Sequence, residues 1–107
     1  MRDFPEKDWK VLRKHKDHLL NEFCGTVFEK IEKIKSDKNK SNHEKYLALW
    51  KMIKIEDKKI RTMFDDWRRS QAIMRIASML FHGVLTKEIF SEFSEDTQKR
   101  ASNLIEL

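Results

Sequence analysis

The sequence predicts an all-α fold, a bundle of four to five helices with a long antiparallel helical hairpin and a short helical tail at the carboxyl terminus. Residues 26–82 contain neither glycine nor proline, the two residues that most strongly break helices. Apolar residues recur every three or four positions through much of the chain, which is the spacing of one helix face. The chain has 107 residues, so we expect a single domain over residues 1–107.

The first helix of the hairpin is expected over residues 6–36. Asp3 is the predicted N-cap, Pro5 tolerates an early helical position, and Glu6 can reach back toward the cap. From there apolar residues follow a helical rhythm as far as Ile34. These signals place the start of the helix within the first six residues.

Two features of this first helix leave alternatives open. Residues 13–18 contain no apolar side chain, so this segment is either a break, with Asp17 capping a second helix, or the polar face of one continuous helix. Gly25 is either a tolerated weak point or a position where another helix approaches closely. The sequence does not choose between the alternatives in either case.

The second helix of the hairpin is expected over residues 43–64. Residues 36–40 have the composition of a loop. Ser41 and Glu44 are spaced so that the serine hydroxyl accepts from the third helical N–H while the glutamate accepts from the serine N–H. This capping box is the best-defined helix boundary in the sequence.

A break is expected at Asp65 and Asp66. The apolar seam that begins at Tyr46 continues with spacings of four and three as far as Phe81. A single helix over residues 43–82 would be about 60 Å long, whereas a compact domain of this size has a radius of gyration of about 13 Å. Either the helix breaks, or the molecule is elongated or dimeric. Aspartate favours helix starts over helix interiors, so we predict the break there.

The remaining elements are a buried helix over residues 67–82 and a short helical tail. Residues 72–81 are apolar on nearly every side, which is typical of a helix at the centre of a protein. Gly83 suits the end of this helix in a left-handed conformation. Two short helices are expected after it, over residues 86–93 and 94–105, with a threonine and a serine at their first positions.

Composition and hydropathy predict a cytoplasmic protein. Residues 1–8 are polar and unlike a secretory signal peptide. The longest apolar stretch, residues 76–85, is about half the length of a membrane-spanning helix. Cys24 is the single cysteine, so we expect a reduced thiol and no disulfide within the chain. We expect neither a membrane nor a cofactor as a partner.

The methionine and aromatic side chains are expected mostly in the core. Because the core is thin, part of this stripe can remain exposed, and an exposed apolar patch marks a partner surface. The stripe comprises Met52, Met63, Met74, Met79, Phe64, Phe81 and the three tryptophans.

A cluster of charged residues beside a tryptophan is the predicted partner-binding patch. Arginine and tryptophan are enriched in binding hot spots. The structural alternative is a helix N-terminus, where acidic groups complement the helix dipole. The arginine inside the apolar helix needs a carboxylate from another helix or another chain, or else extends to the surface. The patch consists of Asp65, Asp66, Trp67, Arg68, Arg69 and Arg75.

Two sets of basic residues at helical spacing make nucleic-acid binding the first alternative function. Such faces bind phosphates by releasing counterions. Acidic residues interrupt both sets, and the sequence places no aromatic residue among them in a stacking pattern, so a solvated lysine-rich face is the structural alternative. The first set is Lys10, Arg13, Lys14 and Lys16, and the second is Lys51, Lys54, Lys58 and Arg61.

Metal binding is the second alternative function. His15, His18 and Glu22 share one face of a continuous helix, and imidazole and carboxylate groups suit zinc, iron or nickel. A further ligand must come from elsewhere, and His43 and His82 are the available candidates. The structural alternative is a pair of solvated histidines.

The leading prediction is a non-enzymatic helical interaction or regulatory module. The sequence contains no phosphate-binding Walker loop, no nucleophile elbow, no zinc-protease motif and no dinucleotide fingerprint. Amphipathic helices with a thin core leave apolar edges that need a partner. We therefore expect binding to an unidentified protein, and the chain itself is a candidate partner that would make it a homodimer.

Overall fold

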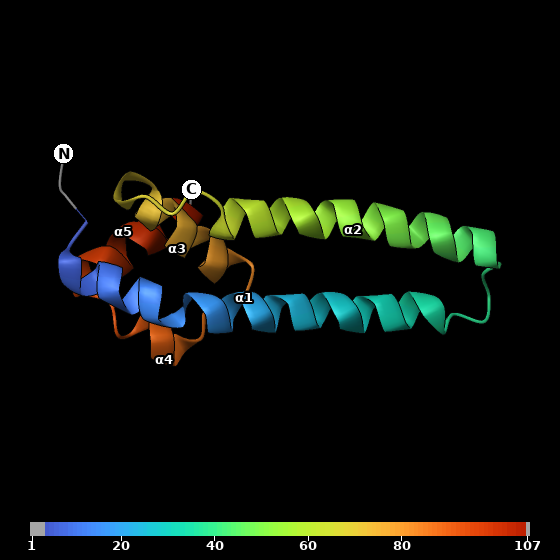
Figure 1. Cartoon of the computed structure of the whole chain (residues 1–107). Helices are drawn as coiled ribbons and strands as arrows, with labels where there is room; N and C mark the ends of the chain where they lie inside the picture. Colours follow the sequence, from blue (N-terminus) through green and yellow to red (C-terminus); the bar gives the residue numbers. More distant parts are fainter. Residues whose placement is uncertain (1–3, 107) are drawn as a thin grey trace.

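The computed structural model describes residues 4–106 and shows an elongated helical protein (Figure 1). Five α-helices and one 3₁₀ turn account for the regular structure of this part of the chain, so the all-α prediction is confirmed. The elements are α1 (Glu6–Lys35), α2 (Asn42–Phe64), the 3₁₀ turn η1 (Arg69–Gln71), α3 (Ala72–Phe81), α4 (Lys87–Phe90) and α5 (Glu95–Glu106).

α1 and α2 form the predicted antiparallel hairpin, and the three shorter α-helices gather at one end of it (Figure 1). We call residues 27–57, which form the free end of the hairpin, the arm, and the other described residues the head. The molecule measures 53 × 23 × 23 Å and has a radius of gyration of 16.5 Å. It is therefore elongated even though the long helix is broken, because the two helices of the arm have only each other to pack against.

α1 runs without interruption through residues 13–18, so this segment is one face of a continuous helix and Asp17 does not cap a second one. A Cβ atom built on Gly25 would meet nothing within 4 Å. Gly25 is therefore a tolerated weak point, and the alternative interpretation, that another helix approaches closely there, is wrong. The predicted cap Asp3 lies outside the described residues. The helix begins after Pro5, whose carbonyl accepts from the N–H of Trp9 at 3.0 Å.

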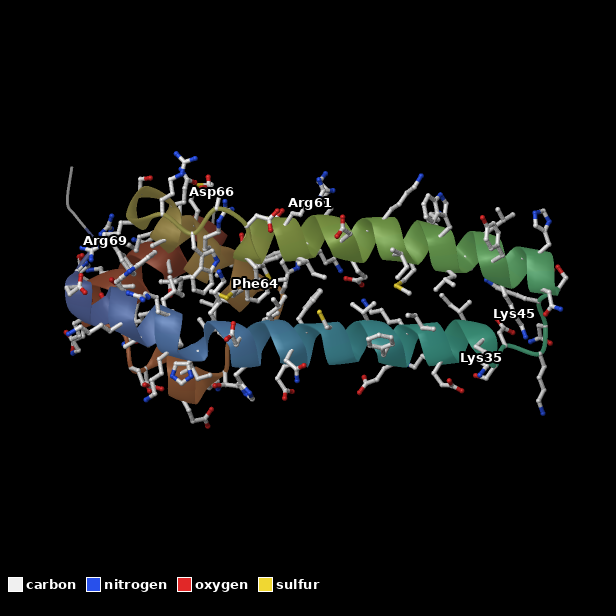
Figure 2. The ribbon with its side chains drawn as sticks, in the orientation of Figure 1. Lys35, Lys45, Arg61, Phe64, Asp66 and Arg69 are labelled. Carbon is white, nitrogen blue, oxygen red and sulfur yellow. The ribbon has the colours of Figure 1, made fainter. Side chains whose placement is uncertain are left out.

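The predicted capping box starts α2. The hydroxyl of Ser41 accepts from the N–H of Glu44 at 3.1 Å, and the carboxylate of Glu44 accepts from the N–H of Ser41 at 2.9 Å. That backbone hydrogen bond lowers the pKa of Glu44. At the same end of the arm, Lys45 Nζ donates to the carbonyl of Lys35 at 2.7 Å and ties the two helices together (Figure 2).

The predicted break is confirmed, but the third helix starts later than residue 67. α2 ends at Phe64, and Asp66 has a φ of 54°, in the left-handed region. Trp67 then folds back on the end of α2, where its Nε1 donates to the carbonyl of Met63 at 2.9 Å and its ring stacks on Phe64. Because this reversal occupies the segment before η1, the α-helical geometry begins only at Ala72.

α3 is the centre of the head, as its apolar sequence predicts. Ile76 and Met79 are fully buried between α2 and α5, together with Met63 of α2. Gly83 ends the helix with a φ of 71°, the predicted left-handed cap. The first helix of the tail is shorter than the expected helix over residues 86–93. α4 forms a single turn, which is capped by the Thr86 hydroxyl.

A buried carboxylate joins the two ends of the chain. Asp8, in the first turns of α1, is completely buried. It accepts from the N–H and the hydroxyl of Ser94 at 2.7 and 2.6 Å, and from the hydroxyl of Thr97 at 2.5 Å. These donors lie at the N-terminal end of α5, where a negative charge also meets the positive end of the helix dipole. Asp8 therefore caps α5 from another helix.

Candidate functional site

The predicted partner-binding patch forms the corner between α2 and α3, and most of its charges are paired within the chain. Arg68 Nε lies 2.6 Å from Asp66 Oδ1, and Arg69 forms an ion pair with Glu6 of α1. Asp65 is exposed. The alternative of a helix N-terminus is wrong, because the two aspartates follow the C-terminal end of α2. Ion pairs within the chain thus stabilise the corner, which supports a structural role for it.

The arginine of the apolar helix is half-buried, and its partner is a backbone carbonyl instead of the predicted carboxylate. Arg75 Nη1 donates to the backbone carbonyl of Thr62 at 2.6 Å. This carbonyl belongs to the last turn of α2, where the helix dipole is negative. Arg75 therefore joins α3 to the end of α2 without a carboxylate.

The structure does not bring the two basic sets together. The set from Lys10 to Lys16 lies on α1 in the head, whereas the set from Lys51 to Arg61 follows the exposed side of α2, with Arg61 pointing away from α1 (Figure 2). A tryptophan ring accompanies one lysine of each set, and Lys16 Nζ of the first set lies 4.7 Å from the centre of the Trp67 ring. Trp50 is 55% exposed, and Lys54 Nζ lies 5.0 Å from the centre of its ring.

The predicted metal ligands separate into two environments. His15 Nε2 lies 3.0 Å from a carboxylate oxygen of Glu92 and joins α1 to the segment after α4. His18 and Glu22 instead line a pocket to which Ile89 of α4 also contributes. Within residues 4–106, no group of three or more histidine, cysteine, aspartate or glutamate side chains is placed to hold a metal ion. The geometry gives the metal hypothesis no support.

That pocket, which we call the polar pocket, has a volume of about 450 Å³ and lies between α1, α2, α4 and the turn that follows α3. Its floor is apolar, made by Leu19, Phe23, Val84 and Ile89. Sequence spacing could not predict it, because four separate segments contribute to it. Its polar lining consists of His18, Glu22, Thr26, Lys30, Lys59, His82 and Thr86.

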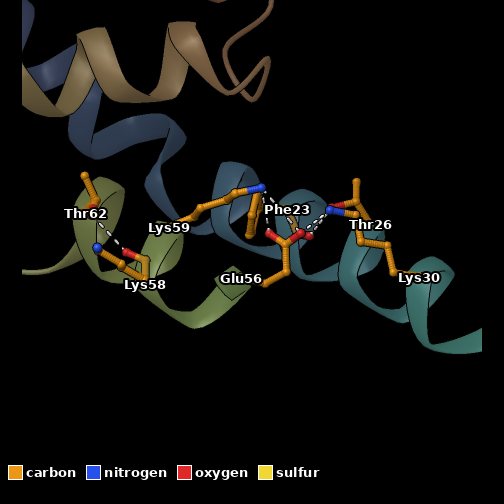
Figure 3. Close-up of polar contacts among 7 residues, drawn as sticks. All are labelled: Phe23, Thr26, Lys30, Glu56, Lys58, Lys59 and Thr62. Carbon is orange, nitrogen blue, oxygen red and sulfur yellow. Dashed lines mark hydrogen bonds and ion pairs between the residues drawn. The ribbon is translucent and has the colours of Figure 1, made fainter. Parts of the chain in front are cut away.

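A buried glutamate forms ion pairs with the two lysines of the polar pocket. Glu56 of α2 is 3% exposed. It forms ion pairs with Lys30 of α1 and with Lys59, whose Nζ lies 3.3 Å from Oε2 (Figure 3). Burial by itself would raise the pKa of Glu56, but the hydrogen bonds and charges of the two lysines outweigh it and lower the pKa. The carboxylate is therefore charged and holds both ammonium groups at the pocket wall.

His82 faces the same charges from the end of α3. Its burial lowers the pKa of the imidazole, and the positive charge of Lys59 lowers it further, while Glu56 acts in the opposite direction. The imidazole is consequently neutral at pH 7. Perturbed pKa values that gather in a concave site are a mark of function, although structural ion pairs produce them too.

A second hollow, the α3–α5 groove, is apolar and has a volume of about 390 Å³. Met74 is 55% exposed and Phe81 69% exposed on the α3 side, and Leu104 is 45% exposed on the α5 side. Met63, Phe64 and Met79 of the predicted core stripe are buried, whereas Met74 and Phe81 at this groove and Trp50 on α2 remain exposed. The groove is completed by Ala77, Ser78, His82 and Ile105.

Comparison with protein-family models, with curated proteins and with solved structures found no match to this chain. The molecule is therefore described by its fold alone, as a helical hairpin with a small helical head whose hollows include the polar pocket and the α3–α5 groove. Among the helices of residues 4–106, none combines the length and the apolar composition needed to cross a membrane.

Proposed function

We propose that this protein is a non-enzymatic helical interaction module that binds a partner protein through the α3–α5 groove. The observation that carries the proposal is the exposure of Met74, Phe81 and Leu104 around one apolar hollow. A single exposed apolar side chain is ordinary on a protein surface, but a contiguous patch marks an interaction site. Methionine adds a flexible side chain that adapts to a partner.

The groove suits one or a few apolar side chains of a partner, of the kind that a helix presents at spacings of three and four residues. A cytoplasmic location is part of this proposal. The single cysteine, Cys24, cannot form a disulfide within the chain, which is consistent with a reducing compartment.

Replacing Phe81 tests the groove, and the chain offers a matched control. Phe81 of α3 and Phe28 of α1 are both 69% exposed, so either should accept a charge without unfolding the protein. We expect Phe81→Asp to weaken partner binding at least about tenfold, because a charge cannot be buried in an apolar contact. Phe28→Asp should leave binding unchanged.

The first measurement is self-association, by light scattering after size exclusion, since it needs only the purified protein. A dimer that dissociates in Phe81→Asp and persists in Phe28→Asp identifies a second copy as the partner. If the protein is monomeric, a photoreactive residue at position 81 or 28 identifies contacts with other proteins in host extract. Photo-crosslinks from position 81 that are lost when Met74→Asp is also present would support the proposal. Equal crosslinking from positions 81 and 28 would contradict it.

Nucleic-acid binding remains the second candidate, because Trp50 is exposed beside Lys54 on the basic face of α2. Aromatic stacking next to cations is the usual arrangement for single strands. If all four cations of this face contact phosphates, the logarithm of the affinity should fall with the logarithm of salt concentration with a slope of about −3. Titration of labelled single-stranded RNA and DNA measures it; no binding at low salt excludes this candidate, as does binding that Trp50→Ala leaves unchanged.

A further inference from the structure

We propose that the polar pocket binds a small organic anion, a carboxylate or phosphate group on a short apolar body, with Lys59 and His82 as its principal contacts. This proposal does not depend on the α3–α5 groove. The pocket is large enough, because its volume of about 450 Å³ lies within the range of small-molecule sites, roughly 300–1,000 Å³.

The distribution of side chains in the pocket fits such a ligand. The apolar floor, which includes Phe23 and Ile89, can receive the body of the ligand. Lys30 and Lys59 come from neighbouring helices and line one wall, and His82 lies at the end of α3. Small-molecule sites combine an apolar lining with a few convergent polar groups in this way.

Hydrogen-bond donors remain available at this wall. Lys59 contacts Glu56 at 3.3–3.5 Å, and its side chain is 32% exposed. An ammonium group has three donors, so this lysine can serve a ligand while it stays paired. The ring of His82 packs edge-on against Phe81, and no hydrogen bond to its nitrogens occurs in the described part of the chain. Both groups can therefore contact an anion without breaking the fold.

The formal charges around the pocket balance, so an anion would be recognised by the donors that remain available on Lys59 and His82. The lining carries two ammonium groups, on Lys30 and Lys59, and the carboxylate of Glu22. The carboxylate of Glu56 lies between the two ammonium groups and pairs with both (Figure 3). At His82 the positive charge of Lys59 lowers the pKa more than the negative charge of Glu56 raises it. A bound anion would act in the opposite direction to Lys59 and would favour protonation of the ring.

The proposal predicts that binding takes up a proton. The charged or titratable groups that line the pocket with His82 are His18, Glu22 and Lys30 on α1 and Lys59 on α2, with Glu56 behind. The pKa of His82 is below its usual value of 6.5 in the free protein, and an anion raises it. Affinity therefore increases as the pH falls toward the pKa of His82 in the free protein, by at most about tenfold per pH unit for one proton.

The experiment uses the whole chain and follows the imidazole resonances of His82 by NMR while benzoate is added. Benzoate stays an anion between about pH 7.5 and about pH 5.5, the range in which histidine titrates. We expect a saturable shift, tighter binding at the lower pH, and a raised pKa of His82 in the complex. Benzamide, a neutral compound of nearly the same shape, should bind at least several-fold more weakly.

Inorganic phosphate, titrated at one pH, shows whether the anionic group suffices without an apolar body. Lys59→Gln should reduce benzoate affinity, while Lys58→Gln, an equal charge change at an exposed neighbour outside the pocket, should not. If Lys59→Gln fails to fold, His82→Gln serves instead, with shifts of Val84 as the readout. The proposal is overturned if benzoate gives no saturable shift, if benzamide binds as well, or if both lysine variants behave alike.

Discussion

Asp8→Ala should destabilise the protein by about 3 kcal/mol, because it leaves one buried donor and two half-buried donors without their acceptor. Those donors are the N–H and hydroxyl of Ser94 and the hydroxyl of Thr97, all within 2.5–2.7 Å of the carboxylate. Thr97 is completely buried, so water cannot easily replace the lost partner. Urea unfolding followed by circular dichroism measures the change in the free energy of unfolding.

The control for this prediction is Asp17→Ala, which removes the same charge from an exposed position of the same helix. Its effect should lie within about 0.5 kcal/mol of zero. Asp8→Asn keeps the shape but turns one acceptor into a donor that faces other donors, so it should also destabilise the protein. Equal effects of Asp8→Ala and Asp17→Ala would show that Asp8 does not anchor α5.

Ile76→Ala should cost about 3 kcal/mol of stability, since Ile76 is completely buried in α3 and the substitution leaves a cavity in the head. Met74→Ala, two residues away in the same helix, removes a side chain that is 55% exposed. It should change stability by less than about 1 kcal/mol. The same unfolding experiment compares the two variants.

The comparison of Ile76→Ala with Met74→Ala also separates an effect on stability from an effect on partner binding. Met74 lines the α3–α5 groove, so Met74→Ala should weaken partner binding while the protein stays folded. A large loss of stability in Met74→Ala, or a small one in Ile76→Ala, would mean that α3 presents a different face to the core.

Local signals in the sequence predicted most helix boundaries. The capping box of Ser41 and Glu44, the left-handed Gly83 and the break after Phe64 all depend on residues within four positions of one another. The predicted start of α3 at residue 67 was too early, because the Trp67 side chain donates a hydrogen bond to the end of α2. This contact outweighs the helical propensity of the residues that follow.

The candidate sites were less predictable than the helices. The apolar stripe correctly raised the prospect of an exposed part, but an all-apolar segment such as residues 72–81 does not reveal which face another helix will cover. The docking of α5 leaves Met74 and Phe81 outside and Ile76 and Met79 inside. The polar pocket left no sequence signal, because its lysines and histidines resemble the solvated charges around them.

The sequence by itself determined that this chain folds into helices, where most of them begin and end, and that two of them form a long hairpin. Capping, periodicity and the absence of helix breakers act between near neighbours, so they can be read from the order of residues. Only the tertiary structure decided that Asp8 meets Ser94, that Glu56 is buried between Lys30 and Lys59, and that the α3–α5 groove stays open. These outcomes depend on contacts between distant segments, whose geometry is set by how the helices pack against one another.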